Sequence, residues 1–234
     1  MDSITQGFIR AFELIFQLNA GLFGIILLSL KVSGLALLLA TAFGLPIGAA
    51  FGLKQFPGRA LAISATNTLM GLPPVVVGLF VYLLLSRKGP LGFLGLLYSP
   101  GAMIVAQTIL AAPIVIALCH SAIVNVDPII RQAARTLGAT PRQETFAVIR
   151  EARYGILSAI IAAFGRVMAE VGAILIVGGN IAGYTRVMTT TIALETDKGN
   201  FELALALGII LLLISFIINA ALHGVQKRGA VKTT

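Results

Sequence analysis

Long apolar runs, separated by short charged segments, constrain this chain more than any other feature of its sequence. The chain has 234 residues, of which 58% are hydrophobic and 11% are charged. Apolar runs of about 20 residues are typical of helices that cross a lipid bilayer. They fall at residues 23–52, 61–85, 103–123, 155–177 and 201–223. We therefore expect an all-α integral membrane protein with about five transmembrane helices.

The ends of the chain differ from this apolar body. Residues 1–22 repeat apolar side chains at helical spacing among polar ones, which predicts an amphipathic helix lying at the membrane interface. Residues 23–223 are expected to form a single transmembrane domain, and residues 224–234 a basic tail.

The net charge of +8 comes mainly from basic residues in the loops between the apolar runs. This distribution follows the positive-inside rule and does not indicate nucleic-acid binding. If residues 127–154 are cytoplasmic, ten Lys and Arg lie on that side and five on the other. We therefore expect the N-terminus outside and the C-terminus in the cytoplasm.

Residues 127–154 form the one long polar interruption of the sequence. Asp127 before a proline, and Thr140 three residues before Gln143, are both signals for the start of a helix. Gly138 lies between them, where a residue in the left-handed conformation would end the first helix. The pattern predicts a short helix, a tight turn and a second helix that leads into the membrane, an element suited to docking a partner.

No catalytic arrangement is visible in the sequence. It has no paired carboxylates, no Ser/His/Asp set and no phosphate-binding glycine loop. Cys119 and His120 have no neighbours at the spacing of a metal site. We expect no enzyme activity, cofactor or metal on this chain, so any ATP must be hydrolysed by another subunit.

Two features inside the apolar runs are candidates for lining a transport pathway. Pro73 and Pro74 must kink or break the helix predicted at 61–85, either for packing or to face a wet cavity. Arg166 and Glu170 lie deep in the run 155–177, where each bare charge would cost about 3 kcal/mol. Being four apart on one helical face, they could neutralise each other, as a structural ion pair or in contact with cargo. We expect that face to point into the bundle.

A third candidate is the polar stretch after residue 177, predicted to be a loop over residues 178–200. Its glycines give a mobile backbone, and Asn180, Thr185 and Arg186 supply donors that could meet an oxyanion. An ordinary external turn is the alternative interpretation.

Residues 132–141 (Gln-Ala-Ala-Arg-Thr-Leu-Gly-Ala-Thr-Pro) resemble the "EAA" loop of permease subunits of bacterial ABC importers. In that family the loop forms a coupling helix that fits a cleft in the ATPase subunit. Gln132 stands where Glu is usual, and Arg150-Glu151 replace a common Leu-Pro pair. The resemblance assigns ATPase coupling to Gln132, Ala133, Ala134, Arg135, Leu137, Gly138 and Pro141.

The likeness extends over most of the chain and points to one branch of that family. Residues 72–78 (Leu-Pro-Pro-Val-Val-Val-Gly) and 164–173 are similar to segments of sulfate, molybdate and tungstate permeases. Residues 177–180 and 194–201 look most like tungstate permeases. The resemblance implies a type I importer permease fold in a bacterial or archaeal inner membrane. With this resemblance, the candidate residues of the translocation pathway are Pro73, Pro74, Arg166, Glu170, Asn180 and Thr185.

The resemblance also implies partners. A chain with about five spans and no internal repeat supplies half a pathway, so a homodimer is expected, with an ABC ATPase dimer that uses ATP and Mg²⁺. An extracytoplasmic oxyanion-binding protein would deliver tungstate, or alternatively molybdate or sulfate. The more distant alternative is a stand-alone secondary transporter or channel that uses Arg166 and Glu170 as an ion relay.

Overall fold

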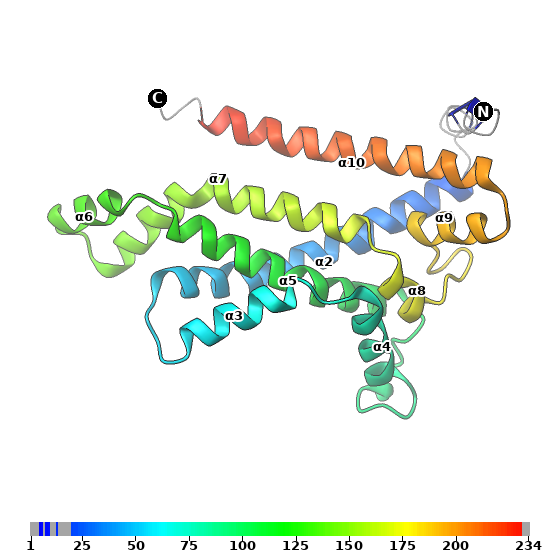
Figure 1. Cartoon of the computed structure of the whole chain (residues 1–234), viewed down its shortest axis with the longest axis horizontal. Helices are drawn as coiled ribbons and strands as arrows, with labels where there is room; N and C mark the ends of the chain where they lie inside the picture. Colours follow the sequence, from blue (N-terminus) through cyan, green and yellow to red (C-terminus); the bar gives the residue numbers. More distant parts are fainter. Residues whose placement is uncertain (1–4, 7, 10–12, 14–19, 231–234) are drawn as a thin grey trace.

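The computed structural model describes residues 5, 6, 8, 9, 13 and 20–230, and within them every element is helical (Figure 1). The amphipathic helix expected in residues 1–22 falls largely outside the described residues. Long helices run along the molecule's long axis: α2 (Ala20–Leu53), α5 (Pro100–Val124), α7 (Pro141–Met168) and α10 (Phe201–Ala230). Shorter elements connect them: α3 (Arg59–Leu69), α4 (Pro74–Leu85), η1 (Gly92–Leu94), α6 (Pro128–Thr136), α8 (Gly172–Gly178) and α9 (Met188–Asp197).

The long helices place the connecting segments at two opposite ends of the bundle. The end of α2, the start of α3, α6 and the last turns of α10 lie at one end in Figure 1. The start of α2, α8 and α9 lie at the other. The loop between α2 and α3, the segment around α6 and the end of α10 therefore share one end, as the count of basic residues assumed. The side of the membrane that this end occupies stays a prediction.

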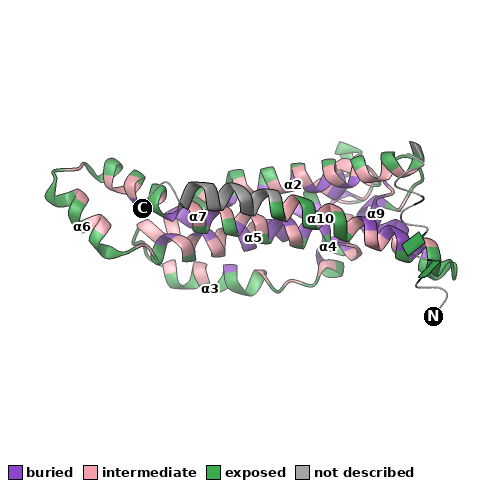
Figure 2. Cartoon of the chain, turned by 90° about the horizontal axis from the view of Figure 1, so that it is seen from above, coloured by how far each residue is buried: buried purple, intermediate pink, exposed green. Residues whose placement is uncertain are grey.

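The core lies along α5, which is buried for most of its length between α2 and α7 (Figure 2). Gly44, Gly48 and Gly52 of α2 are spaced by four and face α5. A Cβ atom at Gly48 would lie 2.6 Å from the carbonyl oxygen of Ile116. Small residues here let the two backbones approach closely.

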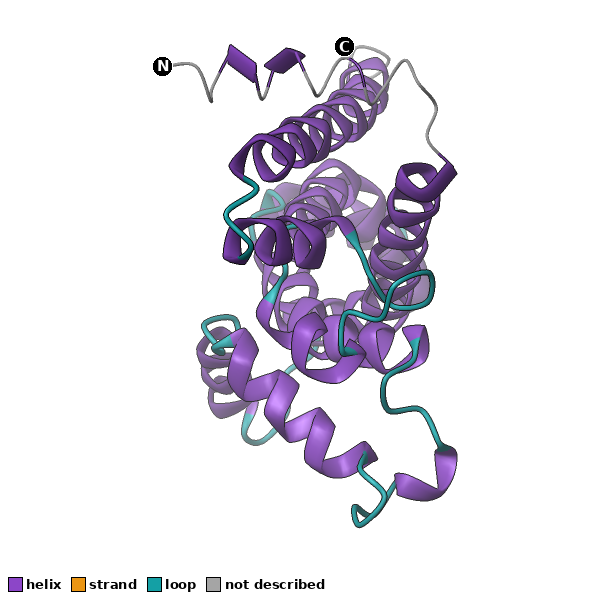
Figure 3. Ribbon diagram, turned by 90° about the vertical axis from the view of Figure 1, so that its right-hand side faces the viewer, coloured by secondary structure: helices purple, strands orange, loops and turns teal. Residues whose placement is uncertain are grey.

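The two prolines break the second apolar run. Helices α3 and α4 meet at 101°, and Pro73 is the N-cap of α4. Figure 3, viewed from the end that carries α8 and α9, shows α4 leaving the bundle of long helices. It packs on α8, where a Cβ at Gly78 would lie 2.8 Å from the Cα of Ala173. The predicted break is confirmed, and residues 61–85 form two helices and not one continuous helix.

A second break corrects the prediction of one helix over residues 155–177. Helix α7 ends at Met168, and α8 leaves it at 59°. The predicted loop 178–200 is also wrong in part, because it contains α9. Its three consecutive threonines have a low helix propensity, so the sequence signal for this helix is weak. All three are buried, and Thr190 Oγ1 accepts a hydrogen bond from Val187 N at the start of the helix. Helix α10 continues from its predicted end at residue 223 to Ala230, so much of the expected basic tail is helical.

The helices fit a membrane protein by length and composition. Within the described residues, three are long and apolar enough to cross a bilayer, at 21–53, 100–124 and 201–220. The count reaches five if each bent pair, α3 with α4 and α7 with α8, is one span. This agrees with the expectation of about five.

Candidate functional site

The polar connector, residues 127–144, is built as the sequence predicts. Asp127 Oδ1 accepts a hydrogen bond from Ile129 N at 2.8 Å and caps α6. Gly138 follows α6 with φ of 77°, and Ala139 N donates back to Ala134 O at 3.0 Å. This is the hydrogen bond of a glycine-ended helix. The chain therefore reverses within a few residues.

The second half of the connector begins with the predicted capping box. Thr140 N donates to Gln143 Oε1 at 2.7 Å, and Gln143 N donates to Thr140 Oγ1 at 3.4 Å. Reciprocal bonds of this kind satisfy backbone groups that the first turn of a helix leaves free. Both helix starts are thus fixed locally, without help from the bundle.

An ion pair that the sequence analysis missed ties the two halves together. Arg135 Nε and Nη2 each donate to a different oxygen of Glu144 at 2.9 Å. The Glu144 carboxylate raises the pKa of Arg135 above its ordinary value. The partners are nine residues apart across a turn, so no helical spacing reveals them in the sequence.

The connector exposes apolar side chains that no described part of the chain covers. Leu137 is 87% exposed and Ile129 is 63% exposed, and α6 buries none of its residues. Isolated helices of nine residues are marginal in water. An uncovered amphipathic helix that is capped at both ends is suited to fit against a partner surface.

Arg166 and Glu170 do not form the predicted ion pair. Because α7 ends at Met168, the two residues no longer share a helical face. No salt bridge joins them within the described part of the chain. Glu170 is 4% exposed, and its Oε1 accepts a hydrogen bond from Ala173 N at 3.1 Å at the start of α8. Arg166 instead lies exposed on the surface of the single chain.

The exposed face of α7 around Arg166 carries small and polar side chains. Four exposed residues of α7 recur at helical spacing: Gly155, Ser158, Ala162 and Arg166. Ala169, the C-cap residue of α7, is exposed as well. Between residues 147 and 174 no large hydrophobic side chain is exposed, whereas α10 exposes several. Of the two residues predicted to point into the bundle, Glu170 is buried in it, whereas Arg166 is exposed on the single chain. A face of this composition suits contact with protein or water better than lipid.

The remaining candidates lie at the two breaks and in the loop after α8. Pro73 is exposed and Pro74 half-buried at the start of α4. Thr185 is fully buried, and its hydroxyl donates to Gly178 O at 2.6 Å and accepts from Ile181 N at 2.9 Å. Asn180 adopts a φ of 50° and donates to Thr190 O at 3.5 Å. Thr185 thus shapes the loop, and its single hydroxyl proton is already donated to Gly178 O and not to cargo.

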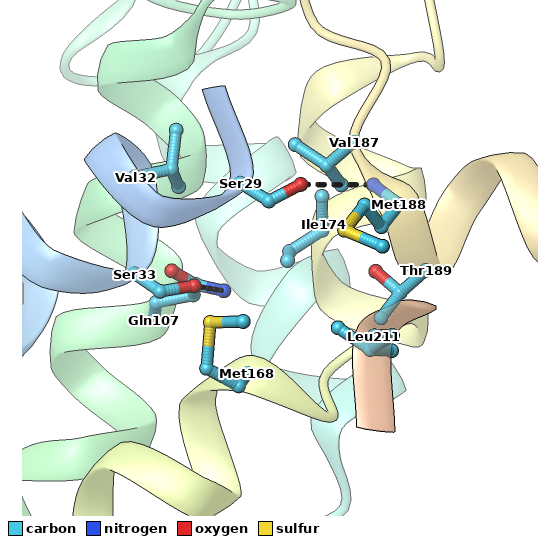
Figure 4. A pocket seen from close by; sticks show the side chains of 10 residues that line it. All are labelled: Ser29, Val32, Ser33, Gln107, Met168, Ile174, Val187, Met188, Thr189 and Leu211. Atoms are coloured by element: carbon cyan, nitrogen blue, oxygen red, sulfur yellow. Dashed lines mark hydrogen bonds between the residues drawn. The ribbon is translucent and has the colours of Figure 1, made fainter. Parts of the chain in front are cut away.

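A buried polar cluster, which the sequence analysis did not identify, lies where the first half of α2, α5, the end of α7 and the start of α9 meet (Figure 4). Gln107 of α5 is 1% exposed, and its Nε2 donates to Val167 O at 3.1 Å. Met188 N donates to Ser29 Oγ at 2.9 Å, and Thr189 Oγ1 donates to Glu170 O at 2.9 Å. The cluster therefore satisfies carbonyls released where α7 ends and pins the start of α9 to α2.

The cluster surrounds a cavity of about 10 Å³, roughly the space of one water molecule. Within the described chain, Gln107 Oε1 is buried and has no hydrogen-bond partner. The cavity is far too small for a polyatomic anion. Gln107 was visible in the sequence as a polar residue in an apolar run, but its partners come from other spans and could not be paired with it.

A helical membrane bundle with an uncovered, capped connector at one end suits a membrane protein that works with another subunit. Comparison with known proteins agrees. Residues 44–229 match the family described as binding-protein-dependent transport system inner membrane component, and the chain belongs to that family. It is a transport component of an ABC transporter in the inner membrane and not itself an enzyme.

Curated relatives cover nearly the whole chain. The tungstate uptake system permease protein TupB of Peptoclostridium acidaminophilum is 41% identical over 97% of this chain and 100% of its own. A probable anion ABC transporter permease of Haloferax volcanii is 48% identical over 82% of this chain and 85% of its own. The molybdenum transport permease ModB of Escherichia coli K12 is 32% identical over 88% and 95%.

Solved structures show the same fold at low sequence identity. The bacterial ABC transporter that imports alginate matches with a TM-score of 0.71 and 21% identity, over 94% of this chain and 83% of that one. The methionine transporter MetNI in an inward-facing conformation matches with a TM-score of 0.72 and 18% identity, over 88% and 95%. The expected type I importer permease fold is confirmed.

Proposed function

We propose that this permease carries a tetrahedral oxyanion into the cell in an ATP-driven importer, and that tungstate is its cargo. The similarity to tungstate uptake permeases carries this proposal, because it holds at 41% and 37% identity over 97% of the chain. Molybdate and sulfate are the alternatives, supported by the relatives named for molybdenum and sulfate transport at 30–32% identity.

The connector is the proposed contact with the ATPase. Its coupling residues are Gln132, Ala133, Ala134, Arg135, Leu137, Gly138 and Pro141. Two capped helix starts and the Arg135–Glu144 ion pair favour a connector that moves as one piece. An ATPase dimer that uses ATP and Mg²⁺ would then shift the ends of α5 and α7 when it closes on two such connectors.

A second copy of the chain is proposed to complete the pathway. The small and polar face of α7, with Arg166 exposed on it, would be unfavourable against lipid and favourable against a matching face across a two-fold axis. Arg166 and the proline break before α4 would then border the path. A stand-alone ion relay lacks support, because Arg166 and Glu170 are not paired.

The end that carries α8 and α9 is proposed to face outside and receive cargo from an extracytoplasmic oxyanion-binding protein. The N-terminus would then be external and the C-terminus cytoplasmic. This orientation puts the connector, with its basic residues, on the cytoplasmic side as the positive-inside rule requires.

Metal content of cells tests the proposed function. A strain without this chain, grown with trace tungstate, should accumulate far less tungsten than the same strain with the chain restored. Equal competition by molybdate and sulfate would favour the alternative cargoes. Uptake by vesicles that contain this chain but neither ATP nor an ATPase would contradict the proposal as a whole.

A further inference from the structure

We propose that a groove between the first half of α2 and residues 182–186 is a binding site for a free tetrahedral oxyanion. The inference rests on the proposed function and deepens it, since it names where the cargo first meets the permease. The groove has a volume of about 590 Å³. It is lined by Gly21, Gly24, Ile25, Leu27, Leu28, Lys31, Ala182, Gly183, Tyr184 and Arg186.

The charges in this lining have one sign. Lys31 stands on the α2 wall and Arg186 on the opposite wall, and none of the lining residues is acidic. Lys and Arg on two sides of one opening attract a small multivalent anion, and an arginine offers several N–H donors to its oxygens. The site sits at the end of the bundle opposite the connector, where the proposed orientation places the outside.

Arg186 is held in place yet keeps unused hydrogen-bonding capacity. Its Nη2 donates to Asn180 O at 3.3 Å, while its Nε is buried without a partner in the described chain. The nearby carboxylate of Glu195 is occupied by Lys198 Nζ at 2.8 Å and Asn200 Nδ2 at 3.0 Å. Lys198 and Asn200, with a smaller contribution from Arg186, hold the pKa of Glu195 below its ordinary value. Glu195 therefore does not form a hydrogen-bonded pair with Arg186.

The two walls are fixed relative to each other. The bond from Met188 N to Ser29 Oγ joins the loop to α2 two residues after Arg186 and two before Lys31. Buried Thr185 stabilises the loop through hydrogen bonds to Gly178 O and from Ile181 N. Gly24 and Gly183 leave open space where a side chain would otherwise stand. A rigid, open groove with two cations is a site prepared before its ligand arrives.

Binding of sodium tungstate to the purified permease–ATPase complex in nanodiscs tests the proposal. Equilibrium dialysis without binding protein and without ATP should show saturable binding that molybdate and sulfate compete for and that salt weakens. Lys31→Gln and Arg186→Gln should each raise the Kd about tenfold or more, the scale of a lost charge-assisted hydrogen bond. Arg186→Lys should retain part of the affinity. Lys88→Gln, which removes an exposed cation outside the groove, should leave the Kd unchanged.

Three results would overturn the site: no saturable binding by the wild-type complex, equal Kd values in all variants, or binding abolished whenever anionic lipid is present. The last would mean that lipid phosphate, and not free oxyanion, occupies the groove. Lys31 is exposed on a helix, so Lys31→Gln remains informative if Arg186→Gln fails to fold. ATP-driven uptake by wild-type vesicles is measured separately. Uptake without groove binding refutes this site alone, whereas no uptake of any oxyanion refutes the proposed function.

Discussion

At the scale of single residues, the connector depends on one glycine. Gly138 has a φ of 77° and joins α6 to α7, and no atom lies within 4 Å of where its Cβ would be. Space is therefore not the constraint at this position. The constraint is the left-handed backbone, which side chains other than those of Gly and Asn adopt at a cost.

We predict that Gly138→Ala destabilises the connector by about 1–2 kcal/mol, the cost of a left-handed non-glycine residue. ATP-driven uptake should fall while the amount of permease in the membrane stays constant. Gly138→Asn should retain most of the uptake, because Asn tolerates this conformation better. Equal uptake by the Ala and Asn variants would show that the turn geometry does not limit coupling.

At the scale of elements, α2 and α5 are held together by close backbone approach. Gly48 faces Ile116 O and the Cβ of Cys119, which a Cβ at this position would approach to 2.6 Å and 2.9 Å. Contacts this short leave no room for a side chain, and the backbone of α5 cannot shift without disturbing the core.

We predict that Gly48→Val lowers the stability of the solubilised protein by about 1–3 kcal/mol, as overpacking does in other cores. The control is Gly34→Ala, also within α2, where nothing lies within 4 Å of the added Cβ. Because the chain has no tryptophan, scanning calorimetry would be used to measure the thermal unfolding of both variants. A Gly48→Val protein as stable as the control would mean that α2 and α5 separate easily.

The tie between α6 and α7 gives a third prediction. Glu144→Gln removes one partner of the Arg135 ion pair, so α6 should move more freely and coupled uptake should fall. The double variant Arg135→Glu with Glu144→Arg restores opposite charges at the two positions. Recovery of uptake in this double variant would assign Arg135 to the tie. Continued loss would assign it to direct contact with the ATPase.

How much the sequence predicts depends on whether its signals are local. The caps at Asp127 and Thr140 and the turn at Gly138 are local, and all were predicted correctly. The break at Pro73 was predicted because proline acts on its own turn. The break after Met168 has no proline to mark it. Gln107 and Thr189 reach it from other parts of the chain, and the carboxylate of Glu170 at the break caps the start of α8.

The misassigned ion pair follows from the same limit. Arg166 and Glu170 share a helical face only if the helix continues, and the prediction assumed that it does. Lys31 lines a groove whose other wall is about 150 residues away in the sequence. Long-range packing decides both cases, and spacing within one run does not reveal it.

At the scale of the whole molecule, one chain leaves a face that the membrane does not favour. From residue 147 to the end of α7 the exposed positions are small or polar, while α10 exposes Leu212 and Phe216. Two copies that bring their α7 faces together would cover this surface and leave the apolar faces to lipid. The proposed homodimer is therefore also a proposal about which helices meet at its axis.

We predict that a single cysteine at Ala162, on the exposed face of α7, forms a crosslink between two copies. The background is Cys119→Ala, which removes the single natural cysteine. A short bifunctional thiol reagent applied to native membranes should yield a dimer band on a denaturing gel. Leu212→Cys, which is 71% exposed on α10, should give no such band, because lipid covers it. Crosslinking at position 212 but not at 162 would place the two-fold axis at α10 and move Arg166 away from the pathway.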